Sequence, residues 1–281
     1  MESSQQHPER QEPTPPPSLM RLLWLSCWVC VLFSGPVFGF GALQTVMERD
    51  GEYAHLCENE VEAEVRVGGR GCAAQETAMS LIYALGGSLP FWSAPTGFIL
   101  DLLGPTVSAG IAGVLVSSGL LLVGVSSTAP GGIDMLAFGF LLMGVGGCLG
   151  TMCVFPVSFL FPKERQGQIL GLLNCLFDAS SAVFLPLQLL HGLSPTIFSR
   201  LHWFGVSAGL AASLYGSLVV TWRGGHSASF AAIKRHSKSA SDGHRSENAL
   251  HSRSSSKRPI FERGVREQVC SAEFGCFAAF C

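Results

Sequence analysis

Three polar side chains in one long apolar segment could together hold a small solute. Asn174, Asp178 and Ser181 are spaced i, i+4 and i+7, so a continuous helix would place them on one face. A carboxylate near the middle of a bilayer costs at least about 2.5–3.5 kcal/mol on insertion scales, so it must face a cavity or a polar partner. We interpret this face as part of a solute path; the alternative is an interhelical hydrogen-bond cluster that holds a helix bundle together.

A glycine-containing segment of the first apolar run could face the same path. Gly35, Pro36 and Gly39 lie in the middle of that run, where proline and closely spaced glycines bend a helix or let another helix approach. We therefore add Gly35 and Gly39 to the candidates for the solute path.

A second set of residues could act as a conformational gate. The sequence Gly97-x-x-x-Asp101-x-x-Gly104 separates two apolar runs by a short turn, which places the carboxylate against the membrane face. Arg165 follows a later run on the same side and can bind a carboxylate bidentately. We predict that Asp101 and Arg165 form a latch, with Gly97 and Gly104 as further gating candidates. The alternative is that Asp101 caps the following helix through backbone N–H groups.

Two cysteines lie in the one long loop between apolar runs, an acidic segment that covers residues 47–76. Cys57 and Cys72 could form a disulfide if this loop faces an oxidising compartment, and the sequence leaves two free thiols equally open. Cys27-x-x-Cys30 has the spacing of a redox motif, but it lies inside an apolar run, so we interpret both cysteines as small buried side chains.

The sequence contains no recognisable motif of an enzyme. It has no P-loop, dinucleotide fingerprint, Gly-x-Ser-x-Gly elbow or paired metal-ligand spacing. We therefore expect no catalytic residue, no cofactor and no metal. The formal net charge of −2 gives no indication of a nucleic-acid partner.

Composition and charge distribution indicate a helical protein that crosses a lipid bilayer several times. The 281 residues are 48% hydrophobic and 14% charged, and the charges are concentrated between long uncharged runs. Residues 77–100, for example, carry no charge and would extend roughly 36 Å as a helix, enough to cross a bilayer core. We predict an all-α membrane domain over residues 19–222 with six spans, at about 19–43, 77–100, 105–126, 135–161, 169–190 and 201–222.

The remaining segments follow from the same pattern. Residues 1–18 and 223–268 are polar and are expected to be disordered, whereas residues 269–281 turn apolar again, like the truncated start of a seventh span. Residues 162–167 are expected to form a short basic turn. Most Lys and Arg residues outside the spans fall on the side of the amino terminus, which predicts that this terminus is cytoplasmic. Glycine pairs at four-residue spacing are expected to mark packing faces: Gly35/Gly39, Gly146/Gly150, Gly167/Gly171 and Gly205/Gly209.

Several of these motifs resemble those of known transporters. The turn from Gly97 to Gly104 after the second span resembles the signature of the major facilitator superfamily. Five segments resemble, in order, solute carrier family 43, the sodium-independent system-L facilitators of large neutral amino acids, and their protozoan relatives. These segments are 32–39 (LFSGPVFG), 52–57 (EYAHLC), 72–76 (CAAQE), 95–101 (PTGFILD) and 177–183 (FDASSAV). The resemblance covers about residues 20–222 and implies alternating-access transport of an amino acid, with the plasma membrane as the expected location; the family also includes a nucleobase carrier.

The chain departs from this family in two ways. The basic residues that usually follow the acid and the second glycine of the turn are replaced by Leu102, Pro105 and Thr106. The family has twelve spans, whereas this chain has six, so the resemblance implies an amino-terminal half, from a truncated gene model or fragment. A missing carboxy-terminal half or a second copy would then be its partner. The other interpretations are a non-transporting membrane protein or degenerate half-carrier, and a transporter of another small solute such as a nucleobase.

Overall fold

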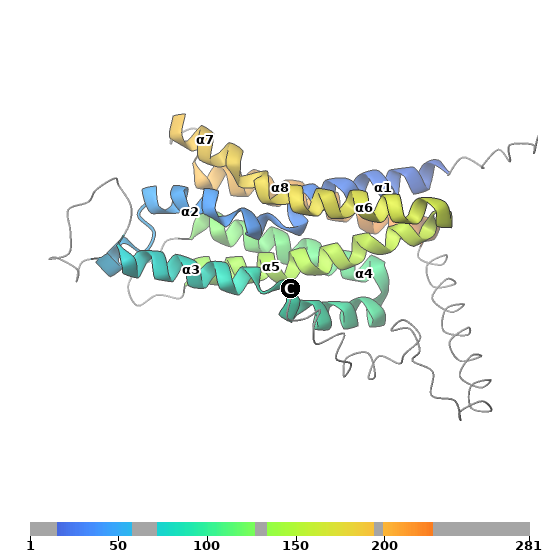
Figure 1. Cartoon of the computed structure of the whole chain (residues 1–281), viewed down its shortest axis with the longest axis horizontal. Coiled ribbons are helices and arrows are strands. Elements are labelled where there is room, and N and C mark those ends of the chain that lie inside the picture. The colour runs from blue at the N-terminus through green and yellow to red at the C-terminus, as the bar shows by residue number, and fades with distance from the viewer. Residues whose placement is uncertain (1–15, 58–71, 127–133, 194–198, 227–281) are drawn as a thin grey trace, which may run out of the picture. The chain divides into compact units, whose positions relative to one another are not determined.

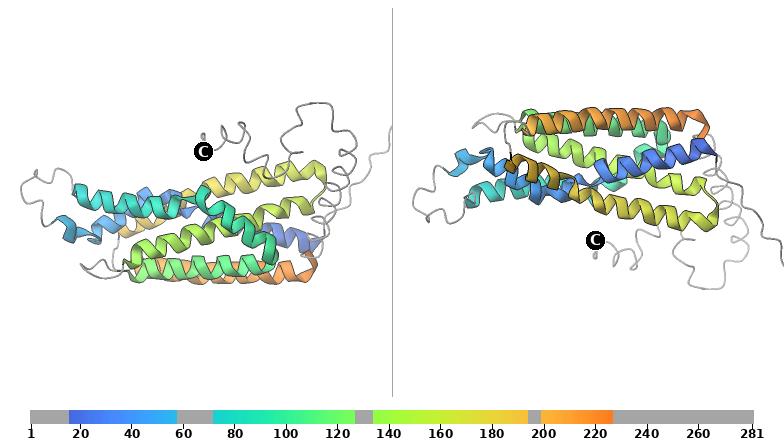
Figure 2. Two further views of the ribbon diagram at one scale, coloured as in Figure 1. Left: turned by 90° about the horizontal axis from the view of Figure 1, so that it is seen from below. Right: turned by 90° about the horizontal axis from the view of Figure 1, so that it is seen from above.

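The chain runs back and forth along one axis as a bundle of helices (Figures 1 and 2). The computed structural model describes residues 16–57, 72–126, 134–193 and 199–226, and all the regular structure of these residues is helical. Five helical stretches are long and apolar enough to cross a membrane. The longest, Ala73–Val125, has 53 residues and makes two passes, because the backbone reverses at Gly104. The all-α membrane protein predicted from composition is therefore confirmed, and the described residues make six passes along the bundle.

The first pass is bent at its middle, as the sequence predicts. Pro36 has no N–H, and its ring clashes with the carbonyl of Leu32, so an α-helix cannot continue through it. Gly35 lies between the helical segment that ends at Ser34 and the one that begins at Pro36, with φ −137° and ψ 27°. The pass consists of α1 (Pro17–Val29), a π-helical turn (Cys30–Ser34), a 3-10 turn (Pro36–Gly39) and α2 (Phe40–Arg49).

The second pass is broken where the sequence predicts an uninterrupted span over residues 77–100. It begins earlier, with α3 (Ala73–Gly87), and is interrupted at Ser88 before α4 (Leu89–Val125). Pro90 cannot donate a backbone hydrogen bond to the preceding turn, and the Ser88 hydroxyl donates to the carbonyl of Leu85 at 2.8 Å instead. Hydropathy alone does not reveal such a break, because the apolar run continues across it.

The hairpin between the second and third passes depends on Gly104. Its φ of +76° lies in the left-handed region that favours glycine, and it separates the two helical parts of α4. Pro105 then occupies the first turn of the third pass, where a missing N–H costs little. Figure 1 shows the chain turning back on itself at this point.

The last three passes contain a further break and correct one prediction. The helix of the fourth pass tightens to a 3-10 turn at Pro156, which has no backbone N–H to continue the helical ladder. The predicted basic turn over residues 162–167 is wrong: only Phe161 and Pro162 interrupt the helix, and Arg165 lies in the first turn of the fifth pass. Lys, Glu, Arg and Gln are all good helix formers, and Glu164 suits a helix N-terminus. The elements are α5 (Met135–Val154), a 3-10 turn (Phe155–Leu160), α6 (Lys163–Ala179), a 3-10 turn (Ser180–Phe184), α7 (Leu185–Leu193), α8 (Arg200–Thr221) and a π-helical turn (Trp222–His226).

Glycines bring the backbones of the core close together. Most residues of α5 are buried, and this helix packs against α3, α4 and the first pass. A Cβ on Gly119 of α4 would lie 2.8 Å from the carbonyl oxygen of Gly139 in α5. A Cβ on Gly150 would collide with the hydroxyl of Tyr215 in α8. Close approach of this kind is what small residues allow in membrane bundles.

Two of the four predicted glycine pairs act as packing positions in the described chain, and two do not. Gly146/Gly150 and Gly35/Gly39 contact neighbouring passes. Gly167/Gly171 of α6 and Gly205/Gly209 of α8 have no atom of another element within 4 Å of where a Cβ would be. The faces of α6 and α8 that carry these pairs are therefore uncovered by any described residue.

Several predictions fall outside the described residues. They concern the amino-terminal tail up to residue 15, the centre of the long loop (58–71), and the whole segment from residue 227 to 281, which includes the predicted seventh span.

Candidate functional site

Two helix breaks face each other where the first pass meets the fifth. Gly35 is buried, and a Cβ on it would lie 2.6 Å from the hydroxyl oxygen of Ser180. A Cβ on Gly39 would fall on the carbonyl oxygen of Ser181. In the described chain the two predicted path glycines therefore set the distance between the two passes, through contact with the backbone and hydroxyl of the fifth.

The break in the fifth pass is formed by its own serines. The Ser180 hydroxyl donates to the carbonyl of Phe177 at 2.5 Å, and the Ser181 hydroxyl donates to the carbonyl of Asp178 at 2.8 Å. Such local bonds compete with the helical ladder, and the helix tightens here to a 3-10 turn. Because a 3-10 turn has about three residues per turn, Ser181 does not continue the stripe as a continuous α-helix would. Its side chain is half-buried.

Asn174 and Asp178 are exposed on α6, immediately before this break. Asp178 lies fifteen residues after Lys163 and fifteen before Leu193, where the fifth pass begins and ends. At about 1.5 Å per residue it is roughly 22 Å from either end, so it lies at the middle of the pass. Neither side chain has a hydrogen bond or ion pair with any described residue. The interhelical cluster that was the alternative interpretation therefore has no partner within this part of the chain.

The same face of α6 continues toward its start as small residues. Gly167, Gly171, Asn174 and Asp178 follow each other at spacings of four, three and four, which keeps them in one stripe. All four are exposed. The stripe therefore combines room for close approach with two polar groups at the middle of the pass.

The second pass places its polar groups differently. The Trp92 indole N–H donates to the Ser88 hydroxyl at 3.1 Å, across the break. Thr96 is buried, and its hydroxyl lies 3.4 Å from the sulfur of Cys148 in α5. Gly97 has open space around it. The Thr96–Cys148 contact attaches the second half of this pass to the fourth, whereas the Trp92–Ser88 bond stays within the second pass.

The gating candidates lie at the end of the bundle where α1 begins. Asp101 is exposed and lies three residues before the reversal at Gly104, and Arg165 is exposed in the first turn of α6. Figure 1 shows the reversal in α4 and the start of α6 toward the same end of the bundle. The latch between Asp101 and Arg165 remains a prediction.

The opposite end of the bundle holds a group of charged and polar side chains, all but Asp50 largely buried, which we call the polar clamp (Asp50, Glu52, Gln75, His191 and Arg200). The guanidinium of Arg200 lies 2.5 Å from the Glu52 carboxylate and 4.0 Å from that of Asp50. Asp50 also lies 3.2 Å from Nε2 of His191. The side chains of Glu52, His191 and Arg200 are only 4%, 7% and 12% exposed. Arg200 also donates to the carbonyl of Ser126 at 2.5 Å.

The polar clamp joins the ends of five passes. Asp50 and Glu52 follow α2, Gln75 belongs to α3, Ser126 ends α4, and His191 and Arg200 belong to α7 and α8. A buried charge stripped of its partner is costly, so this group has to stay together. The sequence shows that Arg200 and the acidic loop share one end of the bundle, but it does not indicate which of the eight acids of residues 47–76 Arg200 contacts.

A tyrosine adds the fourth pass, which the polar clamp does not reach, to this end. The Tyr53 hydroxyl donates to the carboxylate of Asp134, which also caps α5 by accepting from the N–H of Ala137 at 2.9 Å. Burial and this hydrogen bond together raise the pKa of Tyr53 above its ordinary value of about 10. The phenol therefore stays neutral and able to donate; its contribution to stability is present below about pH 10 and lost only at higher pH.

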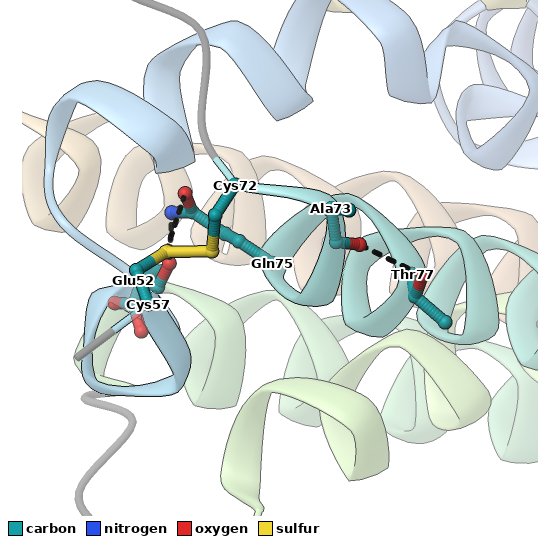
Figure 3. Close-up of a disulfide and its surroundings, with 6 residues drawn as sticks. All are labelled: Glu52, Cys57, Cys72, Ala73, Gln75 and Thr77. Atoms are coloured by element: carbon teal, nitrogen blue, oxygen red, sulfur yellow. Dashed lines mark hydrogen bonds between the residues drawn. A yellow bond between two sulfur atoms is a disulfide. The ribbon is translucent and has the colours of Figure 1, made fainter. Parts of the chain in front are cut away.

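Cys57 and Cys72 are joined by a disulfide beside the polar clamp (Figure 3). Their Cα atoms are 5.7 Å apart, within the range that a disulfide requires. Of the two alternatives that the sequence leaves open, the structure has the cross-link. Gln75, three residues after Cys72, donates from Nε2 to the backbone carbonyl of Glu52 at 2.6 Å.

Comparison with known proteins gives relatives over part of the chain. It is 31% identical over 170 residues to Protein FMP42 of Saccharomyces cerevisiae, covering 59% of this chain and 32% of that protein. It is 33% identical over 170 residues to equilibrative nucleobase transporter 1 of Bos taurus, covering 60% of this chain and 34% of that protein. The chain thus spans about a third of the length of the curated relatives that it matches. No family model matches, and no solved structure matches.

Proposed function

We propose that this chain forms one wall of a membrane transporter for a small polar solute, with Asn174 and Asp178 on that wall. The observation that carries the proposal is a carboxylate and an amide exposed at the middle of a long apolar pass, without a partner among the described residues. Lipid would make such a position costly, whereas a solute or an aqueous path would not. The nearby breaks support it, because discontinuous helices commonly surround substrate sites in transporters.

The other wall is a second six-helix body, supplied by a carboxy-terminal continuation or by a second copy. The exposed stripe of α6, with Gly167 and Gly171, gives that body a close approach. The two bodies rock against each other, and Asp101 and Arg165 latch one conformation, with Gly97 and Gly104 in the hinge. The chain is a carrier and not an enzyme, and one body alone does not transport.

A nucleobase is the first solute class to test, and a large neutral amino acid is the second. Between Arg70 and Lys163, and again between Arg165 and Arg200, the sequence has no Lys or Arg. This wall therefore offers an acid and an amide at membrane depth but no cation for a carboxylate. Such a pair suits a ligand that presents N–H donors, as a nucleobase edge does. The nucleobase transporter among the relatives points the same way; the segments that resemble the system-L facilitators keep the amino acid as the alternative.

The orientation follows from two observations. Disulfides persist in oxidising compartments, so the end that carries Cys57–Cys72 faces the outside. The Lys and Arg residues are concentrated on the other side. We therefore propose a cytoplasmic amino terminus. The plasma membrane is proposed on a different ground, the resemblance to the system-L facilitators.

A chimera tests this function. The matching segment of the bovine nucleobase transporter is replaced by this chain, and uptake of labelled adenine and leucine is measured in cells. We expect adenine uptake, and Asp178→Asn should lower it about tenfold or more, since a hydrogen bond to a charged group contributes about 1.5–3 kcal/mol. Glu164→Gln, an exposed acid at the start of the same helix, is the matched control and should have no effect.

Three outcomes would change the proposal. Uptake of leucine without adenine would replace the solute class. A chimera that reaches the cell surface but moves neither solute would favour a degenerate, non-transporting half. Uptake by the purified 281-residue chain in liposomes, above empty liposomes, would narrow the proposal to a second copy as the other wall and remove the carboxy-terminal continuation from it.

A further inference from the structure

The disulfide and the polar clamp hold the same two segments together. Cys57 and Cys72 link the turn after α2 to the start of α3, and Gln75 links the same α3 to Glu52 by its hydrogen bond of 2.6 Å. Figure 3 shows the disulfide and this hydrogen bond side by side. Glu52 in turn carries its carboxylate to Arg200 on α8. The position of Glu52 therefore depends on how firmly its own turn is attached to α3.

That turn is strained and needs its attachments. Gly51 and Tyr53, on either side of Glu52, have φ of +79° and +59°. The left-handed region is unfavourable for a tyrosine, so this conformation persists only where contacts impose it. The contacts include the Tyr53–Asp134 hydrogen bond, the Gln75–Glu52 hydrogen bond and the disulfide. Loss of one of them would let the turn relax and would draw Glu52 away from Arg200.

We propose that the Cys57–Cys72 disulfide is a redox-sensitive switch for the polar clamp, opened by a low-molecular-weight thiol. Both cysteines are partly exposed, so a small thiol can reach them. Its thiolate attacks one sulfur of the disulfide and forms a mixed disulfide, which releases the other cysteine as a thiol. A second thiolate then attacks the sulfur of the first small thiol, which releases the remaining cysteine and forms the disulfide of the two small thiols. Two thiols become one disulfide, and the protein gains two electrons and two protons. The freed turn relaxes, and Arg200 loses its closest carboxylate.

The coupling between disulfide and polar clamp separates this switch from a passive cross-link. A passive cross-link stabilises by restricting the unfolded chain, and that effect is the same whether or not the polar clamp is intact. A switch acts through the Gln75–Glu52 hydrogen bond and the Glu52–Arg200 ion pair, so most of the effect of reduction is lost when either of these is already broken. The switch and the passive cross-link therefore predict different changes of melting temperature on reduction, in variants that lack the Gln75–Glu52 hydrogen bond or the Glu52–Arg200 ion pair.

The experiment measures thermal unfolding of the purified full chain in detergent, with and without dithiothreitol. We expect reduction to lower the melting temperature by several degrees, and reoxidation to restore it. In Gln75→Leu, which removes the hydrogen bond to Glu52, reduction should lower it by less than half as much. Arg49→Gln is the matched control: Arg49 is an exposed cation at the same end, and its replacement should leave the full shift in place.

A second variant keeps the test decisive if Gln75→Leu does not fold. Glu52→Gln retains the backbone carbonyl that Gln75 contacts but removes the charge that pairs with Arg200, and it too should reduce the shift. Equal shifts in the wild type and in these variants would overturn the proposal in favour of a passive cross-link. It would also be overturned if both cysteines are alkylated without reductant, or if complete reduction leaves the melting temperature unchanged.

Discussion

Two passes of the described chain are unbroken helices, whereas four are interrupted along their length. The third pass (residues 105–125) and α8 contain no proline after their first turn. Pro36, Pro90, Pro156 and Pro186 lie at or beside the four breaks. All six passes are apolar enough to suit a membrane, so hydropathy does not distinguish the two kinds. Proline and serine do, because they remove or compete for backbone hydrogen bonds.

The unbroken and the interrupted passes have different structural roles in the bundle. The two unbroken passes pack against each other; the third pass also packs against α5, and α8 also packs against α1, and together they form the support. The broken passes bring Gly35 against Ser180 and leave Asn174 and Asp178 exposed beside that contact. The comparison indicates that irregular backbone is concentrated where the candidate site lies, and that the regular passes hold it in place.

The largest expected effect comes from filling the contact between two breaks. Gly39→Ala places a methyl group on the carbonyl oxygen of Ser181, and we expect a loss of about 1–3 kcal/mol because neither backbone can move away easily. Gly41→Ala, two residues on, meets nothing within 4 Å and is the matched control. Thermal unfolding in detergent measures both. Equal melting temperatures for the two variants would mean that the breaks are not tightly packed.

A smaller effect is expected at the break in the second pass. Ser88→Ala removes the hydroxyl that accepts from Trp92 and donates to Leu85, and we expect a loss of about 1 kcal/mol. Ser118→Ala is the matched change in an unbroken pass, where the hydroxyl bonds only to the preceding turn of its own helix. Ser118→Ala should have little effect. A larger loss at Ser118 than at Ser88 would contradict the view that serines maintain the breaks.

The smallest effect, with the opposite sign, is expected on an unbroken pass. Gly209 of α8 is exposed, and no atom of another element lies near it. Gly209→Ala should therefore raise the stability by at most about 1 kcal/mol, since alanine is the better helix former. The same unfolding measurement detects the gain. Destabilisation would mean that this face of α8 is covered by another molecule in the membrane or micelle.

Much of the fold could be predicted from the sequence, but the candidate site only in part. The six passes and the bends at Pro36 and Pro156 follow from hydropathy and from the chemistry of proline. Hydropathy does not predict the break at Ser88, because an apolar run continues across it. The charged residues after Pro162 resemble a turn, but Lys163 to Gln166 are good helix formers, so α6 begins before the predicted span at residue 169.

What the sequence by itself determined is the class of the protein, the number of passes and the polar residues that lie within them. These follow from local properties: apolar length, the missing N–H of proline and the cost of a charge in lipid. Only the tertiary structure decided that Gly35 and Gly39 contact the fifth pass, that Arg200 selects Glu52 among the acids of its end, and that Gln75 and the disulfide share one attachment. These are pairings between residues far apart in the chain, and they depend on distances and burial that no spacing along a single sequence encodes.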